Sequence, residues 1–491
     1  MINKNDDYKM PIVLIGNSFK YEIESICKLF FHTARFNFTE DISEAQGDSY
    51  IITEKSVANN EIKLQAEVRL NGDTPEKEEI LLPENTEKSI AEQELCRLIY
   101  RILCRKTGIT PPWGLMTGIR PVKKVTELMA KGLSREEIEN TLRKRYELSD
   151  SKLSLAYETA VNQQPILDSI DTSAASLYVS IPFCPTRCSY CSFVSHSMAS
   201  AMKLMPQYID ALCRELEIIG RLVKECDTKI DTIYFGGGTP TSISAEDIRR
   251  VMEAVAANFD LDRIREYSFE AGRPDTITEE KLRVIKELGA DRISVNPQTL
   301  NDDVLKVIGR QHTGKEALEA FELARKIGFD NINTDLIAGL PTESAESFKY
   351  TLDKITELSP ESITVHTLTV KRSAALFREG NVNMANPAAE MVDYSIEKLM
   401  AEGYLPYYMY RQKNTVDNLE NVGYAKKAMK ASTTFSLWTK HRQFSVQAVP
   451  HRQNLYIPTD LSTEFTTINS HTNTSIALMN LWRKNRRLLN A

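Results

Sequence analysis

The chain has 491 residues, of which 42% are hydrophobic and 26% charged, and its formal net charge is −6. This size and balance are typical of a globular protein with two or three domains. The negative charge argues against general nucleic-acid binding. No apolar run approaches the roughly 20 residues that span a bilayer, and the first residues lack the apolar stretch of a signal peptide. The sequence therefore predicts a cytoplasmic protein without a membrane or nucleic-acid partner.

The first 175 residues are predicted to form an α+β accessory domain. Strand patterns cover 11–15, 49–53 and 62–68, and helical patterns cover 87–107, 122–131 and 134–146. A loop rich in turn-forming residues, from Thr110 to Pro121, carries Trp113 and breaks this pattern. This loop is interpreted either as a linker or as a lid that contacts an active site.

Residues 176–412 alternate steadily between strand and helix patterns. The strand patterns cover 177–181, 230–235, 266–271, 292–297, 331–337, 362–368 and 407–410, and helical patterns between them include 206–223, 245–256 and 315–326. Repeated β/α units of this length predict a parallel sheet with helices outside it. Six or seven units predict an α/β fold, an incomplete TIM-like (β/α)6 barrel. In such barrels the chemistry lies at the carboxyl ends of the strands.

The loop after the first barrel strand carries three cysteines, Cys184, Cys188 and Cys191, in C-x3-C-x2-C spacing. Three thiolates can hold three irons of a [4Fe–4S] cluster and leave the fourth iron open to another ligand. A structural zinc site would need four ligands, and no second C-x2-C pair follows. Three free cysteines are the remaining alternative. The other five cysteines are predicted to be small core residues of a reduced cytosolic protein: Cys27, Cys96, Cys104, Cys213 and Cys226.

Glycines and polar side chains follow at the ends of later strands. The strand at Ile233 ends in Gly236–Gly238, where the missing Cβ atoms let peptide groups approach a ligand closely; a tight turn is the alternative. Gln298 closes the fourth strand, and its amide can both donate and accept hydrogen bonds. Arg310 fits a ligand carboxylate in bidentate geometry. Asp335 lies among apolar neighbours and needs a partner.

Together these motifs resemble the radical SAM superfamily, and residues 1–426 resemble its oxygen-independent coproporphyrinogen III oxidases. The N-terminal domain and the segment Asn418–Ala425 resemble the Gram-positive branch, coproporphyrinogen dehydrogenase. The resemblance implies two cofactors, a [4Fe–4S] cluster on the three clustered cysteines and S-adenosyl-L-methionine (SAM). It also implies the SAM contacts, which are Tyr178, Tyr190, Gly237, Gly238, Thr239, Glu270, Gln298, Arg310 and Asp335. For Glu270, an unspecific surface carboxylate is the alternative.

The activity that this resemblance implies is the oxidative decarboxylation of two propionates of coproporphyrinogen III to vinyl groups, giving protoporphyrinogen IX in anaerobic haem biosynthesis. An electron donor such as flavodoxin or ferredoxin is implied as a partner. Since the substrate carries four carboxylates, cations are expected at the mouth of the site. The candidates are Arg120, Arg273, Lys371, Arg372 and Arg411, and for each of them a solvated surface charge is the favoured alternative. His196 and His312 lie near the cofactor motifs and are interpreted either as further hydrogen-bond donors or as structural residues.

One departure keeps a second function open. Ser192 and Phe193 follow Cys191, whereas the best-studied oxidases have a fourth cysteine there. The Cys-Ser-Phe ending also resembles related haem chaperones, so the alternative is a haem-binding chaperone with a relict SAM site. The His-Asn-x-x-Tyr-Trp sequence of those chaperones is absent, and they lack the long N-terminal domain. These two differences favour the oxidase.

Residues 413–426 begin a C-terminal segment, and the composition changes after Lys426. Residues 427–491 contain no glycine and nine Lys or Arg, while Asp460 and Glu464 are their sole acidic residues. A basic tail for an acidic partner is one interpretation. The preferred one is a translated frameshift, because a one-base shift permits family-like segments and folded domains use glycine turns and a patterned apolar face. The tail is therefore expected to be disordered and unpacked.

Overall fold

A computed structural model of the chain describes residues 9–31, 34–118, 120–171, 173–192, 196–198, 202–369, 374, 387–412, 415–426 and 443–446. The chain forms two compact units, one of residues 1–157 and 410–419 and one of residues 158–409 and 420–491. The first division lies inside helix α5 (Asp150–Asp168), which continues across it without a linker. The second lies inside strand β14 (Leu405–Arg411).

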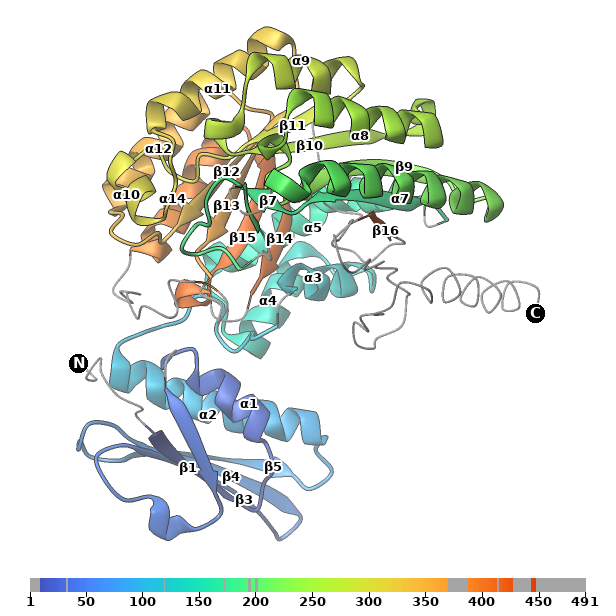
Figure 1. The fold of residues 1–491 in the computed structure, drawn as a ribbon. Coiled ribbons are helices and arrows are strands. Elements are labelled where there is room, and N and C mark those ends of the chain that lie inside the picture. Colours follow the sequence, from blue (N-terminus) through green and yellow to red (C-terminus); the bar gives the residue numbers. More distant parts are fainter. Residues whose placement is uncertain are drawn as a thin grey trace. The chain divides into compact units, whose positions relative to one another are not determined.

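The first unit contains a five-stranded sheet in the order β2-β1-β3-β4-β5. Its strands are β1 (Lys9–Ile15), β2 (Arg35–Thr39), β3 (Tyr50–Ala58), β4 (Glu61–Arg69) and β5 (Glu76–Pro83). Helices α1 (Lys20–Cys27) and α2 (Lys88–Thr107) cover one face of this sheet (Figure 1). Leu95, Ile99 and Ile102 of α2 recur at helical spacing and are fully buried in the core between the two layers. The first unit is therefore an α+β domain, as predicted, with a layer of two helices packed on a five-stranded sheet.

Two further helices of this unit match predicted ranges, α3 (Pro121–Met129) and α4 (Arg135–Tyr146). The start of α4 is fixed by a capping box, in which the Ser134 side chain accepts from the backbone N–H of Glu137 and the Glu137 carboxylate accepts from that of Ser134. Prediction from sequence missed α1, β2, β5 and α5.

The loop between α2 and α3 is packed inside the first unit. Trp113 is 1% exposed, and the guanidinium carbon of Arg411 lies 5.4 Å from the centre of its ring. Arg411 also donates to the carbonyl oxygens of Met116 and Asn418. A Cβ at Gly114 would lie 2.0 Å from the carbonyl oxygen of Tyr146, so this approach requires glycine. The loop therefore anchors segment 410–419 to the first unit.

The second unit contains a nine-stranded sheet in the order β14-β15-β13-β12-β11-β10-β9-β6-β16. Six consecutive strands are parallel: β6 (Ala175–Ile181), β9 (Ile230–Gly237), β10 (Glu266–Gly272), β11 (Arg292–Val295), β12 (Ile332–Ala338) and β13 (Ser362–Thr367). Strand β15 (Glu420–Ala425) then pairs with β13 in antiparallel orientation. This sheet confirms the predicted α/β fold, an incomplete barrel of β/α units.

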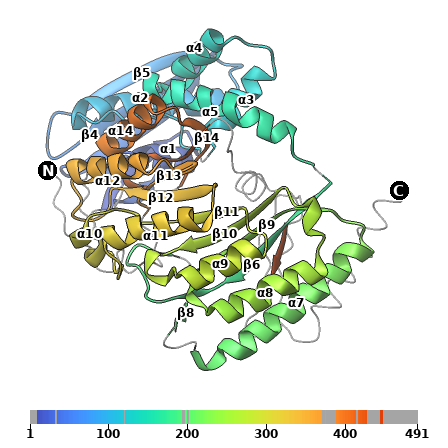
Figure 2. The same ribbon diagram turned by 90° about the horizontal axis from the view of Figure 1, so that it is seen from above.

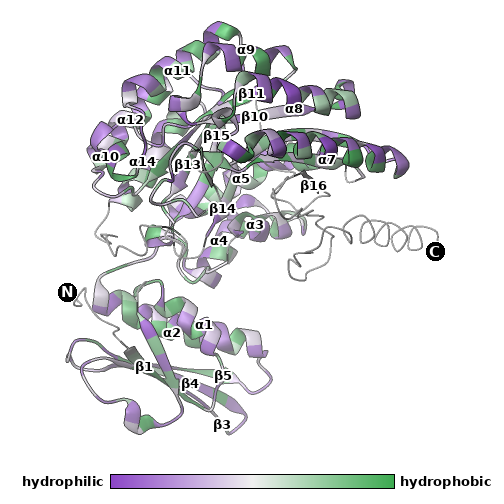
Figure 3. Ribbon diagram, viewed as in Figure 1, coloured by the Kyte–Doolittle hydropathy of each residue, from purple (hydrophilic) through white to green (hydrophobic). Residues whose placement is uncertain are grey.

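Helices cover the outside of this sheet (Figure 2). They are α7 (Met205–Glu225), α8 (Ala245–Asn258), α9 (Glu279–Glu287), α10 (Asp302–Val307), α11 (Gly314–Ile327), α12 (Ala345–Glu357) and α14 (Ala388–Ala401). Each carries both apolar and polar residues along its surface (Figure 3). In α7, for example, Ile209, Leu212 and Leu216 recur at helical spacing and are fully buried in the barrel core.

Strand β16 (Gln443–Val446) is the part of the predicted tail that the structure describes. It pairs in parallel with β6, so the expectation of an unpacked tail does not hold for these four residues. The physical reason is that an incomplete barrel leaves the backbone of β6 unpaired along one edge, where another strand can form hydrogen bonds. Within the described ranges, no helix is both long and apolar enough to cross a membrane.

Candidate functional site

The three clustered cysteines lie on the loop after β6, as the sequence indicates. Cys184 belongs to the short strand β7 (Phe183–Cys184), which pairs with β8 (His196–Ser197). Cys184 and Cys191 are half-buried and Cys188 is buried. Two bonds attach the loop to the end of α10, from Thr186 Oγ1 to the Gly309 carbonyl at 3.0 Å and from the Ser189 amide to the Ile308 carbonyl at 3.0 Å.

Arg273 supports this loop from the end of β10. Its Nη1 donates to the carbonyl oxygen and to Oγ1 of Thr186, at 3.0 and 2.9 Å. Its Nε and Nη2 donate to the two carboxylate oxygens of Asp275, at 3.0 and 2.8 Å. Burial raises the pKa of Asp275, but His312 and Arg273 together hold it below its ordinary value. Arg273 is 3% exposed, and all three of its guanidinium nitrogens donate to Thr186 or Asp275. Its prediction as a cation that binds the substrate was therefore wrong.

We expect Arg273→Ala to loosen the cysteine loop. The change removes two hydrogen bonds to Thr186 and leaves Asp275 buried without its main cation, and bonds to charged groups each contribute about 1.5–3 kcal/mol. Hydrogen–deuterium exchange of a peptide covering residues 184–192 should rise by about ten-fold or more. Arg265→Ala is the matched control, since that guanidinium pairs with Asp231 at 2.5 Å and with Ser169. Equal exchange in both variants would refute the supporting role.

The glycine run at the end of β9 lies directly against the cysteine loop. The Gly238 amide donates to the Ile181 carbonyl at 2.9 Å, and the Thr239 amide to the Phe183 carbonyl at 2.7 Å. A Cβ at Gly238 would lie 2.6 Å from the Phe183 carbonyl oxygen and 3.0 Å from Cys184 Sγ. The hydroxyl of Thr239 is 3.5 Å from the same sulfur. The sequence therefore needs glycine here for the two loops to meet.

Arg310 and Tyr190 meet on the other side of the cysteine loop. Arg310 Nη2 donates to the Tyr190 hydroxyl at 3.0 Å, and Nη1 donates to the carbonyl oxygen of Asn296 at 3.3 Å. The remaining nitrogen, Arg310 Nε, is buried without a hydrogen-bond partner. A buried donor that lacks a partner is costly, so this atom marks a place where a ligand acceptor is expected.

Two carboxyl groups lie within the barrel, Glu270 on β10 and Asp335 on β12. Glu270 Oε2 accepts from the Tyr234 hydroxyl at 3.2 Å, and the Tyr234 ring stacks on Tyr178 with 5.7 Å between centroids. Burial, and then the nearby charge of Asp335, raise the pKa of Glu270 to about 7. Burial also raises the pKa of Asp335, but the neighbouring His366 ring and a hydrogen bond from Asn333 bring it below its ordinary value. The pair therefore combines a carboxyl that is easily protonated with a stable carboxylate.

Gln298 joins β11 to β12 beyond the end of β11. Its backbone φ is +71°, and its amide donates to the Asp335 carbonyl at 3.1 Å while its own carbonyl accepts from the Ile337 amide at 3.1 Å. Its side-chain amide donates to the Asn296 carbonyl at 3.3 Å. Gln298 thus lies beside Asp335 in the barrel, and both residues were predicted from the sequence as SAM contacts.

Other predicted residues lie elsewhere. Arg120 is exposed at the start of α3, and Arg411 is buried against Trp113, so both belong to the first unit and the latter was wrongly predicted as a substrate cation. His312 is buried, with Nδ1 3.7 Å from Asp275 Oδ1, which indicates a supporting role. Lys371, Arg372 and the His196 side chain are outside the described residues.

His366 was missed by the sequence reasoning. Its Nε2 lies 3.9 Å from Asp335 Oδ2. The sequence of the strand Ser362–Thr367 could have indicated it. Ser362, Thr364 and His366 alternate with other residues along this strand, so their side chains lie on the same face of the sheet. Within the described ranges, no three His, Cys, Asp or Glu side chains are gathered as a metal centre, so the assignment of cluster ligands rests on the residues themselves.

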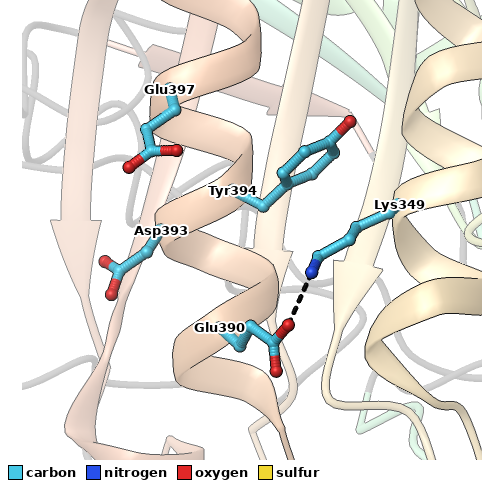
Figure 4. A pocket seen from close by; sticks show the side chains of 5 residues that line it. All are labelled: Lys349, Glu390, Asp393, Tyr394 and Glu397. Carbon is cyan, nitrogen blue, oxygen red and sulfur yellow. Dashed lines mark hydrogen bonds and ion pairs between the residues drawn. The ribbon is translucent and has the colours of Figure 1, made fainter.

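A separate cleft of about 440 Å³ lies between α12 and α14 (Figure 4). It is lined by Lys349, Glu390, Asp393, Tyr394 and Glu397. Lys349 pairs with Glu390 at 2.5 Å, and its ammonium lies 5.5 Å from the centre of the Tyr394 ring. The predicted site residues do not line it, and its open, mostly acidic walls are those of a solvated helix surface.

Comparison with known proteins agrees with this geometry. A family model described as the Radical SAM superfamily matches residues 178–355. The chain is 38% identical over 412 residues to the oxygen-independent coproporphyrinogen-III oxidase-like protein HemZ of Bacillus subtilis, covering 82% of each chain. It is 32% identical over 285 residues to the haem chaperone HemW of the same organism, covering 56% of this chain and 70% of HemW.

Among solved structures, the chain is similar to coproporphyrinogen III oxidase HemN of Escherichia coli, at 24% identity and a TM-score of 0.46 over 61% of this chain and 69% of that chain. The protein belongs to the radical SAM superfamily. Within it, the chain belongs to the family of oxygen-independent coproporphyrinogen-III oxidase-like proteins. The family predicted from the cysteine loop and the glycine run is thereby confirmed.

Proposed function

We propose that this chain oxidatively decarboxylates coproporphyrinogen III, with a [4Fe–4S] cluster on Cys184, Cys188 and Cys191 and with SAM bound beside it. The observation that carries the proposal is the contact between the cysteine loop and the glycine run, where a Cβ at Gly238 would lie 3.0 Å from Cys184 Sγ. Family membership and the 38% identity to HemZ, named as oxidase-like, support the substrate class.

The residues present fit both groups. Three thiols on one loop are the donor set of a cluster with one open iron. The buried, partnerless Nε of Arg310 suits the carboxylate of SAM, and the missing Cβ atoms of Gly237 and Gly238 let the end of β9 lie directly against the loop that would hold the cluster. Hydrogen-atom abstraction from a carbon–hydrogen bond of the substrate is the chemistry that these two groups would supply when bound.

The side chains of the barrel would position the cofactor and exclude water. Glu270 and Asp335 offer carboxylate oxygens to ribose hydroxyls, and the stacked rings of Tyr178 and Tyr234 form an apolar wall beside them. For each vinyl group formed, one propionate of the substrate would lose a hydrogen atom from its β-carbon to the 5′-deoxyadenosyl group of SAM, one molecule of CO2, and one electron to a separate one-electron acceptor. A redox protein of the flavodoxin or ferredoxin class is proposed as the electron donor to the cluster.

The test is an anaerobic assay with reconstituted protein, SAM, dithionite and coproporphyrinogen III. We expect protoporphyrinogen IX and 5′-deoxyadenosine to form together. The second candidate function is haem binding, favoured by the 32% identity to HemW and by the Cys-Ser-Phe ending of the cysteine loop. Stoichiometric capture of haem without protoporphyrinogen IX would reject the oxidase and support the chaperone.

We also expect the affinity for S-adenosylhomocysteine to depend on pH through Glu270. Because its pKa is raised to about 7, Glu270 is protonated below this pH in the folded protein without ligand. Ribose hydroxyls donate hydrogen bonds to the ionised carboxylate. Affinity should therefore fall about ten-fold as the pH is lowered from about 8 to about 6. Isothermal titration measures it. In Glu270→Gln the affinity should be weaker but independent of pH in this range; an unchanged pH profile would contradict the role of Glu270.

A further inference from the structure

His366 lies on the inner face of the barrel, in the same layer as the two carboxyl groups. Strands β12 and β13 are paired so that Asp335 is opposite Thr364 and Ile337 opposite His366. Hydrogen bonds from Ser362 and Thr364 to Asn333 Oδ1, at 2.9 and 3.3 Å, show that alternate residues of β13 share this face. The His366 side chain is 31% exposed, so a ligand in the barrel can reach it.

The ring of His366 has one nitrogen beside a carboxylate and one without a protein partner. Nε2 is 3.9 Å from Asp335 Oδ2. In the described part of the chain, no residue hydrogen-bonds to Nδ1. A carboxylate at one ring nitrogen of a histidine sets the orientation of the other. Asp335 therefore leaves Nδ1 available to a ligand.

Three arginines of this unit that the structure describes are already engaged. Arg310 binds Tyr190 and Asn296, and Arg273 binds Thr186 and Asp275. Arg292, at the opposite end of β11, donates to Ser362 Oγ at 3.0 Å. A substrate with carboxylates that enters beside Glu270 and Asp335 meets negative charge, and repulsion there must be offset by a nearby cation. His366 is placed to donate a hydrogen bond to such a carboxylate.

We infer that His366 binds a carboxylate of the substrate through Nδ1, with the Asp335 carboxylate within ion-pair distance of Nε2. This inference rests on the proposed function, because it names one contact of the same site with the propionate side chains of the tetrapyrrole. Among the described residues, His366 thus takes the place of Arg273 and Arg411, which the structure commits to other contacts, as a group that recognises a substrate carboxylate.

The experiment measures binding of coproporphyrin III, the air-stable oxidised form with the same four carboxylates, by quenching of its fluorescence. His366→Ala and His366→Gln should bind it about ten-fold more weakly than the natural chain, which is the size of one charged hydrogen bond. His366→Lys, which supplies a cation, should restore affinity to within a few-fold. Thr364→Ala is the matched control on the same face of β13 and should change affinity less than two-fold.

Titration with S-adenosylhomocysteine separates the inference from an effect on cofactor binding. We expect the His366 variants to bind it within two-fold of the natural chain. Unchanged coproporphyrin III affinity in His366→Ala would overturn the inference and leave the proposed function standing. Equal losses for both ligands in all three variants, lysine included, would also overturn it, because His366 would then act only through Asp335. A natural chain that does not bind coproporphyrin III would reject the proposed function itself, and the inference with it.

Discussion

Cys188→Ala is expected to remove the iron-sulfur cluster and all cleavage of SAM. Cys188 is the buried member of the cysteine loop, and loss of one of three thiolate ligands leaves two irons of the cube without protein support. The reconstituted natural chain should carry about four irons, since a site with three thiolates suits a cube with one open iron. Iron and sulfide analysis, with chromatographic detection of 5′-deoxyadenosine, measures both effects.

The control for this variant is Cys213→Ala. Cys213 lies on α7, and its Sγ is 3.8 Å from the carbonyl oxygen of Arg250, a weak contact of a half-buried thiol. Iron content and SAM cleavage should stay at the level of the natural chain. If Cys213→Ala lost its iron as completely as Cys188→Ala, the assignment of the three ligands would fail.

Gly238→Ala is expected to disturb the cysteine loop nearly as strongly. The added Cβ would lie 2.6 Å from the carbonyl oxygen and 2.9 Å from the amide nitrogen of Phe183. These are backbone atoms that cannot rotate away, so the loop must shift. Overpacking of this kind costs about 1–3 kcal/mol, which for a unit of this size lowers the melting temperature by several degrees. Iron content after reconstitution should fall several-fold.

Gly118→Ala is the matched control, because a Cβ there would meet no atom within 4 Å and its φ lies outside the left-handed region. Its iron content and melting temperature should match those of the natural chain within error. Full iron content in Gly238→Ala would show that the glycine run is not required for the cysteine loop, and it would remove the main support for the proposed cofactor site.

The sequence predicted the barrel well because its signals are local. Each parallel strand is a short apolar run, and the helices between them begin at side-chain caps such as Ser244 and Thr313, which accept from the backbone of the first turn. Strand β5 was missed because its glutamates and lysine have low strand propensity, and it is held by pairing with β4 along its whole length.

The positions of the candidate site residues on the strands could be predicted from the sequence, but the contacts of the arginines could not. Glu270 and Asp335 lie on strands β10 and β12 and Gln298 follows β11, because position in a β/α unit follows from sequence. The partners of Arg273 and Arg411 do not, since Arg273 bonds Thr186 and Arg411 bonds Met116, 295 residues away along the chain. No local pattern distinguishes a cation that faces solvent from one that such a distant contact buries.

That long-range contact has a consequence during synthesis on the ribosome. The first unit consists of residues 1–157 and 410–419, so its last segment emerges about 250 residues after the rest. At roughly 5–20 residues per second, this delay is on the order of 10–50 s. During this delay the Trp113 ring lacks the contact with the Arg411 guanidinium that it makes in the folded protein. The N-terminal unit therefore cannot mature before the barrel has been translated, and a fragment that ends after α4 would lack part of its own structure.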